Sequence, residues 1–116
     1  MAVKEAIAKE YKYKDVEIWN KRGKIHEGDK LDGYYIAKEE FETKYGPAAS
    51  FIIKTADGMA KVMGQTDIKA KMATLPLGCH VWFEYVGLIE TDRGSKKAYK
   101  INYDDEDVIE VEQENA

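Results

Sequence analysis

Apolar and polar residues alternate along several short runs of this chain, and turn-forming residues separate the runs. The runs cover residues 30–38, 48–55, 59–63, 79–89 and 99–103. Alternation with period two places successive side chains on opposite faces of a strand. The pattern therefore predicts five short β-strands.

The residues between the runs predict how the strands connect. Asp57-Gly58 stands between the second and third runs, and this dipeptide is a strong hairpin signal. Gly33 lies inside the first run, where a glycine usually marks a bend or the close approach of another backbone. Residues 39–46 and 90–97 interrupt the apolar pattern. We expect them to be a charged loop between strands one and two and a cationic loop between strands four and five.

Residues 66–75 change to a helical period. Ile68, Met72 and Leu75 share one face at this spacing, and Pro76 ends the segment. Three strands, one helix and two strands is the order of the OB-fold, a five-stranded, partly open Greek-key barrel. We therefore predict an all-β domain of this type, with one short helix between strands three and four. An SH3-like barrel is the main alternative, but it does not normally have a helix there.

The chain divides into three parts. Residues 1–24 are expected to form an N-terminal arm, in which residues 2–13 fit either a short amphipathic helix or a frayed arm, and residues 16–19 a short strand. Residues 25–103 form the OB-fold domain, and residues 104–116 an acidic C-terminal tail. This tail carries seven acidic residues and no basic one, so the rest of the chain has 18 Lys and Arg against 15 Asp and Glu. The overall charge of −4 therefore does not describe the folded part.

The same composition argues against membrane and secreted proteins. No apolar run approaches the roughly 18–20 residues that span a bilayer. The N-terminal residues lack the apolar core of a secretory signal. The single Cys79 excludes an internal disulfide. We expect a cytoplasmic protein, in the host-cell cytoplasm if the protein is viral, with no membrane contact.

No enzyme motif is visible. The chain lacks a phosphate-binding loop, a zinc-protease motif and a nucleophile with an adjacent base. His26 and His80 fit no metal or triad pattern, and Cys79 begins an apolar strand as a buried structural thiol would. The acidic run 104–107 lacks the spaced ligands of a calcium loop. We predict a protein that is not an enzyme and has no cofactor or metal.

The positive signal is the abundance of aromatic side chains among cations. The chain has eight tyrosines, three phenylalanines and two tryptophans, and buried tyrosine hydroxyls need partners. Single-stranded nucleic acid stacks its bases on aromatic rings while Lys and Arg contact the phosphates. We therefore predict a DNA-binding surface made of Tyr34, Phe41, Lys44, Tyr45, Lys54, Lys61, Trp82, Arg93, Lys96, Lys97 and Tyr99.

In OB-folds the binding surface usually lies on strands two and three, between the loop that joins strands one and two and the loop that joins strands four and five. Lys54 and Lys61 would form this floor. Three alternatives remain open: the aromatic residues of the first loop could pack onto the core, the N-terminal arm could cover Trp82, and the lysines of the second loop could simply solvate a turn.

Short glycine-based motifs add a resemblance over residues 28–103. They are Gly33-Tyr34-Tyr35, Lys44-Tyr45-Gly46, Asp57-Gly58, residues 64–75, Leu77-Gly78-Cys79-His80-Val81, Tyr85-Val86-Gly87 and Lys97-Ala98-Tyr99-Lys100. With these motifs the chain resembles the small OB-fold proteins of bacteriophages that bind single-stranded DNA. The resemblance implies a non-enzymatic protein that coats single-stranded DNA during phage-type DNA replication or recombination.

The resemblance also implies partners. Single-stranded DNA-binding proteins commonly recruit replication or recombination proteins through an acidic C-terminal tail, and residues 104–114 are similar in charge, although a terminal Phe is lacking. We expect a homo-oligomer, with a dimer favoured. The competing hypothesis is an OB-fold protein-interaction or virion structural module without nucleic-acid binding. The weak positive charge outside the tail, +3, favours this hypothesis more than a strongly basic domain would.

Overall fold

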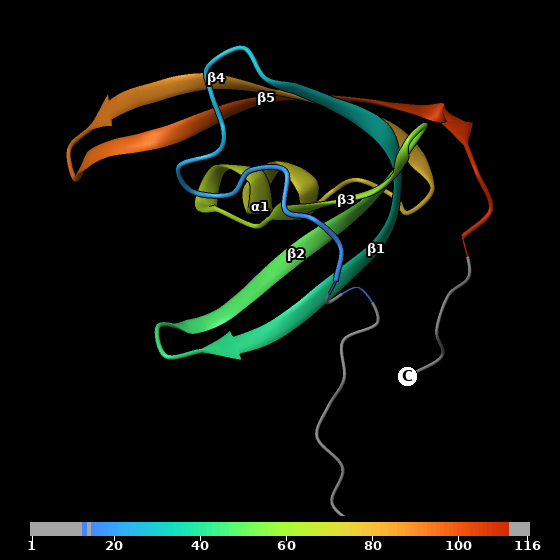
Figure 1. The fold of residues 1–116 in the computed structure, drawn as a ribbon, viewed down its shortest axis with the longest axis horizontal. Coiled ribbons are helices and arrows are strands. Elements are labelled where there is room, and N and C mark those ends of the chain that lie inside the picture. The colour runs from blue at the N-terminus through green and yellow to red at the C-terminus, as the bar shows by residue number, and fades with distance from the viewer. Residues whose placement is uncertain (1–12, 14, 112–116) are drawn as a thin grey trace, which may run out of the picture.

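The computed structural model describes residues 13 and 15–111 of the 116-residue chain. Its one helix and five strands follow the expected order (Figure 1): β1 (Lys30–Thr43), β2 (Gly46–Thr55), β3 (Gly58–Met63), α1 (Thr66–Met72), β4 (Cys79–Thr91) and β5 (Gly94–Val108). All neighbouring strands are antiparallel, in the order β3-β2-β1-β4-β5. The prediction of a mostly β protein with one short helix is confirmed. In the described residues the sheet is not closed, because no ladder joins β3 to β5.

The prediction of loops at residues 39–46 and 90–97 is wrong, because both segments continue the strands into long hairpins. Only Lys44-Tyr45 separates β1 from β2, and only Asp92-Arg93 separates β4 from β5. Residues 39–43 pair with β2, and Lys96 and Lys97 pair with the end of β4. Charged residues stay in these strands because the projecting hairpins leave their side chains in water.

All three hairpins share one turn, which has the sequence Thr-x-x-Gly. In the β1–β2 turn the Thr43 hydroxyl donates to the Gly46 carbonyl at 2.8 Å and accepts from the Tyr45 N–H at 3.1 Å. Thr55 and Thr91 make the same pair of bonds in the other two turns. The glycine has a positive φ each time, which only glycine adopts readily. The threonine therefore ends one strand and the glycine begins the next.

β1 bends so that it can serve both halves of the sheet. Its first residues pair with β4 and its remaining residues with β2, with a register shift between Tyr35 and Ala37. At Gly33 a side chain would collide with the backbone of Lys54. The prediction that Gly33 marks the close approach of another backbone is confirmed, and the sheet curls there around the core.

The segment before β1, rather than β5, occupies the open edge of β3. Lys61 exchanges backbone hydrogen bonds with Glu17 and Trp19, at 2.9 and 2.8 Å. The expected strand at residues 16–19 is thus reduced to an isolated parallel bridge between Ile18 and Lys61. Asn20 is only 2% exposed; its amide Nδ2 donates to the Met63 carbonyl at 3.0 Å and its Oδ1 accepts from the Met63 N–H at 2.8 Å. Asn20 therefore imitates a neighbouring strand.

The open edge of β5 is satisfied in the same way from α1. The Tyr99 N–H donates to Asp67 Oδ2 at 3.1 Å, and Lys71 Nζ donates to the Tyr99 carbonyl at 2.6 Å. Trp19 lies between the two edges, with its ring centroid 6.0 Å from those of both Phe83 and Tyr99. The space where β3 and β5 would meet is thus filled by the segment before β1 and by α1.

The C-terminal boundary differs from the expected one. β5 extends to Val108, so the first residues of the expected acidic tail belong to the sheet. The expected helix at residues 2–13 lies outside the described residues, apart from Tyr13. Cys79 is fully buried, and this burial raises the pKa of its thiol, as expected of a structural cysteine. No helix in the described part of the chain is long and apolar enough to cross a membrane.

Candidate nucleic-acid interface

One face of β1, β4 and β5 points away from the core and carries three rows of side chains. Tyr34, His80 and Asp104 form one row across the strands, and Asp32, Trp82 and Asn102 form the next. The third row is Lys30, Glu84 and Lys100. The alternating residues Val81 and Phe83 are buried in the core, which places the intervening residues outside. We call this surface the outer face.

Three rings on the outer face lie in a row and contact one another. The His80 ring lies 4.8 Å from the Tyr34 ring and 4.0 Å from the Trp82 ring, centroid to centroid. The His80 and Trp82 planes differ by only 17°, so these two rings are stacked. Trp82 is 39% exposed. We call Tyr34, His80 and Trp82 the ring ladder.

Carboxylates hold the middle ring of this ladder from both sides. His80 Nδ1 lies 2.8 Å from Asp107 Oδ2, and His80 Nε2 lies 3.3 Å from Asp32 Oδ2. Partial burial lowers the pKa of His80, but the hydrogen bonds to Asp107 and Asp32 outweigh it and raise the pKa above its usual value. Because both nitrogens face carboxylates, the protonated form of His80 can donate to Asp107 and to Asp32 at once.

Asp107 also connects the ladder to the end of β5. Its Oδ1 accepts a hydrogen bond from the Tyr34 hydroxyl at 3.0 Å. The hydrogen bonds from His80 and then from Tyr34 lower the pKa of Asp107. Neither His80 nor Asp107 is among the binding residues predicted from the sequence. No local signal could have joined them, because a register shift between Cys79 and His80 decides which β5 residue meets His80.

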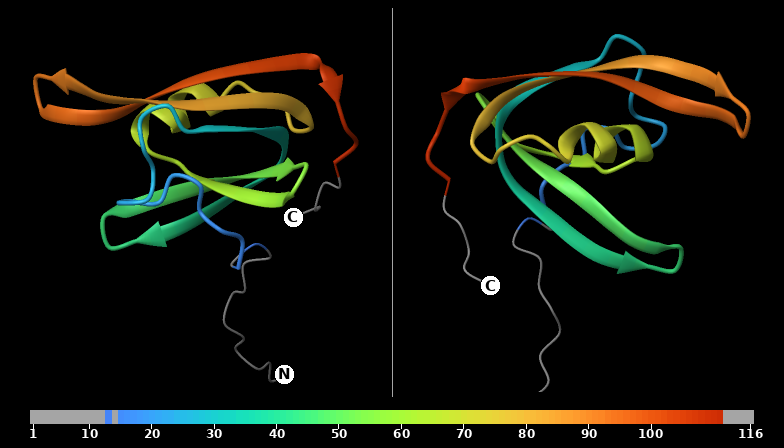
Figure 2. Two further views of the ribbon diagram at one scale, coloured as in Figure 1. Left: turned by 45° about the horizontal axis from the view of Figure 1, so that its top comes forward. Right: turned by 180° about the vertical axis from the view of Figure 1, so that it is seen from behind.

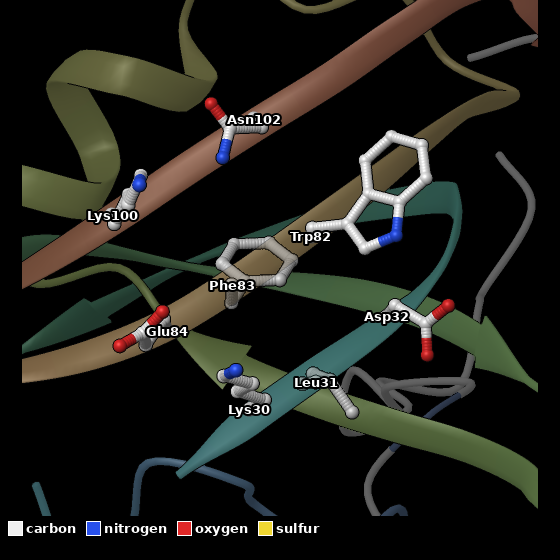
Figure 3. A pocket seen from close by; sticks show the side chains of 8 residues that line it. All are labelled: Lys30, Leu31, Asp32, Trp82, Phe83, Glu84, Lys100 and Asn102. Atoms are coloured by element: carbon white, nitrogen blue, oxygen red, sulfur yellow. The ribbon is translucent and has the colours of Figure 1, made fainter. Parts of the chain in front are cut away.

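A depression of about 380 Å³ lies beside Trp82 on the outer face (Figure 3). Lys30 and Lys100 stand on opposite sides of it, on β1 and β5, with Glu84 between them on β4. Asp32 and Asn102 lie beside Trp82. The depression thus combines one exposed ring with two cations. Its lining residues are Lys30, Leu31, Asp32, Trp82, Phe83, Glu84, Lys100 and Asn102.

The structure brings only some of the predicted binding residues to this face. Tyr34 and Trp82 belong to the ladder, and Lys54 is exposed beside Tyr34 on the neighbouring strand. Lys61 lies on the same face as Lys54, and its backbone is hydrogen-bonded to Glu17 and Trp19. The residue paired with Lys61 is Ile52, which is fully buried although it lies outside the core cluster. The expected floor on β2 and β3 is therefore only partly open to a ligand.

Six predicted residues lie on the two projecting hairpins, namely Phe41, Lys44 and Tyr45 on β1–β2 and Arg93, Lys96 and Lys97 on β4–β5. Both tips extend on the side of the molecule where α1 lies (Figures 1 and 2). Tyr45 is 89% exposed, and Lys44 Nζ lies 5.0 Å from its ring centroid. Phe41 is half-buried, and so is Lys97, whereas Lys96 is exposed. The hairpins form two separate rims rather than one patch.

Tyr99 is not a surface residue. It is 1% exposed and packs against Trp19 and Tyr85, with the Tyr85 centroid 5.2 Å away. Period two correctly separates Tyr99 from Lys100, but Tyr99 belongs to the core side of β5. A base cannot stack on Tyr99 while the protein is folded, so its assignment to the binding surface is corrected.

A scan against protein-family models and searches among curated proteins and solved structures found no match to this chain. Within residues 13 and 15–111 there is also no group of three or more His, Cys, Asp or Glu side chains placed to hold a metal ion. Any function for this surface must therefore be argued from its geometry.

Proposed function

We propose that this chain is a non-enzymatic OB-fold protein that binds single-stranded DNA. The strand order β3-β2-β1-β4-β5, with α1 between β3 and β4, supports the OB-fold assignment. The fold tolerates a partly open barrel. Here the open position lies between β3 and β5, and Trp19, Asn20 and α1 fill it.

The observation that carries the proposal is the exposed end of the ring ladder at Trp82, flanked by Lys30 and Lys100. A base stacked on an aromatic side chain contributes about 1–3 kcal/mol. Cations on either side of the ring can contact the phosphates before and after that base. Lys54, at the other end of the ladder beside Tyr34, extends the cationic track along the outer face.

The rest of the proposal follows from the sequence. The protein would coat DNA exposed during phage-type replication or recombination, in the cytoplasm, as a homo-oligomer. The two hairpins would act as rims for the strand. The acidic residues beyond β5 would recruit replication or recombination proteins.

A titration of the full chain with oligo-dT tests the proposal, with binding followed by the anisotropy of a labelled oligomer. We expect binding that weakens steeply between low and high salt. Trp82→Ala should weaken binding about 5- to 150-fold, because it removes about 1–3 kcal/mol of stacking. Tyr103→Ala is the matched control: Tyr103 is 50% exposed but pairs with the core-facing Val81. Absence of binding at low salt would refute the proposal.

A second function, a protein-interaction or virion structural module, is favoured by one observation. The β4–β5 hairpin exposes three aliphatic side chains: Val86 by 41%, Leu88 by 65% and Ile89 by 43%. Phosphates do not need such residues, whereas protein interfaces bury them. This function predicts unaltered oligonucleotide mobility and a stable oligomer that Leu88→Ser dissociates, which light scattering after size exclusion would detect.

A further inference from the structure

The depression lies beside Trp82, past the end of the ring ladder. One face of the Trp82 ring is covered by His80, at 4.0 Å and 17°. The depression is lined by the Lys30, Glu84 and Lys100 row and not by Tyr34 or His80, and Figure 3 shows it beside the edge of the indole. A flat ring that entered it would lie next to Trp82, between Lys30 and Lys100.

The polar side chains beside such a ring would distinguish between the bases. Asp32 is the β1 neighbour of Trp82, and Asn102 is its β5 neighbour. The Asp32 side chain is 63% exposed, and its Oδ2 is held by His80 Nε2 at 3.3 Å. This contact fixes the carboxylate at the edge of the depression and leaves Oδ1 and the second lone pair of Oδ2 open. An ionised carboxylate accepts hydrogen bonds and cannot donate them. It therefore favours ring edges that carry N–H donors.

Resting on the proposed binding of single-stranded DNA, we propose that the Trp82 depression is a one-base subsite that prefers guanine and disfavours thymine. Guanine presents N1–H and N2–H₂ side by side, which match a carboxylate. Cytosine and adenine present one amino group each. Thymine presents a single N3–H between two carbonyl oxygens, which a carboxylate repels. Lys30 and Lys100 would contact the phosphates of the same nucleotide.

The preference also explains why two carboxylates stand on a face proposed to bind a polyanion. Asp32 and Glu84 both line the depression, and each repels phosphate. Their positions differ: Asp32 lies in the row of Trp82, whereas Glu84 lies in the next row. Asp32 is held in place by His80 Nε2 at 3.3 Å, which makes it the carboxylate that we assign to reading hydrogen-bond donors.

The two tryptophans make a direct test feasible. Trp19 packs against the core, so a Trp19→Phe background leaves Trp82 as the only indole reporter. Its fluorescence is titrated with a short oligo-dT and with the same oligomer carrying one central guanine, adenine or cytosine. We expect the guanine oligomer to bind about tenfold more tightly than oligo-dT, at the low end of a bidentate contact because the site is exposed. Hypoxanthine, which lacks the N2 amino group, should fall between them.

Asp32→Asn should abolish the ranking, because the charged acceptor is lost while the shape is kept. Glu84→Gln is the matched control: it removes the same charge from the same depression. It should strengthen binding of every oligomer equally and leave the ratios unchanged. Thermal unfolding of both variants checks that they remain folded, and the hypoxanthine oligomer tests the contact without any substitution in the depression.

The outcomes distinguish a failure of the guanine subsite from a failure of the proposed DNA binding. If all oligomers bind equally well, or if Asp32→Asn leaves the guanine preference intact, the subsite is refuted and the proposed function stands. If hypoxanthine binds as guanine does, the N2 contact is refuted. If no oligomer binds at low salt, the proposed function itself fails.

Discussion

Two groups of aromatic side chains in this protein are built alike but differ in exposure. Trp19, Phe83, Tyr85 and Tyr99 pack together where β3 and β5 fail to meet, with centroids 5.2–6.0 Å apart. Tyr34, His80 and Trp82 contact one another on the outer face, with centroids 4.0–4.8 Å apart. The first group is covered by the segment before β1 and by α1, whereas the second ends at an exposed indole. The first group of aromatic residues therefore stabilises the fold, whereas the second group is available for binding.

The comparison predicts the largest loss of stability at Trp19. Trp19→Ala removes the ring that contacts both Phe83 and Tyr99, and should lower the free energy of unfolding by about 3 kcal/mol. Trp82→Ala should lower it by about 1 kcal/mol, because that ring is partly exposed. Urea unfolding followed by circular dichroism measures both. Equal losses at the two tryptophans would contradict the division.

A smaller loss is expected at Asn20, which supports the first group. Asn20→Ala leaves the N–H and carbonyl of Met63 without their partner, and should cost about 2 kcal/mol. Asn102→Ala is the control, because Asn102 is exposed on the outer face. The same unfolding experiment checks the pair. A loss at Asn20 no larger than that at Asn102 would show that the side chain does not replace a strand.

The smallest effect concerns pH and the second group. The pKa of His80 is raised in the folded state, so its contribution to stability is complete below the unfolded value of about 6.5 and disappears as the pH rises through the folded-state pKa. The difference in unfolding free energy between the natural protein and His80→Asn should therefore be larger at pH 6 than at pH 9. A difference that does not change with pH would mean that His80 is uncharged in the ladder.

The sequence predicted the order of the elements because local periodicity specifies strands and helix. It did not predict the hairpins, although Thr43, Thr55 and Thr91 each precede a glycine by three positions. Asp57-Gly58 predicts the middle hairpin one residue later than the Ala56-Asp57 turn of the structure, and the other two turns are predicted as loops. The repeated Thr-x-x-Gly pattern would have located all three.

The candidate site was harder to predict, for a different reason. Alternation divides each strand into two faces but does not say which face is inside, so Trp82 and Tyr99 were assigned to one surface. The contact between His80 and Asp107 joins residues 27 positions apart. It depends on the pairing of β4 with β5 and on a register shift near Cys79. Such contacts are set by the whole sheet and leave no local pattern.

The side chains that replace a β3–β5 ladder have a consequence for how this fold can diverge. A barrel closed by backbone pairing has a circumference fixed by its strands and their shear. Here the sheet is open, and the side chains of Asn20, Asp67 and Lys71 contact its two free edges. Longer or shorter side chains at these three positions would widen or narrow the gap between β3 and β5 without moving any strand out of register. Single substitutions could thus change the distance between the two free edges of the sheet during evolution.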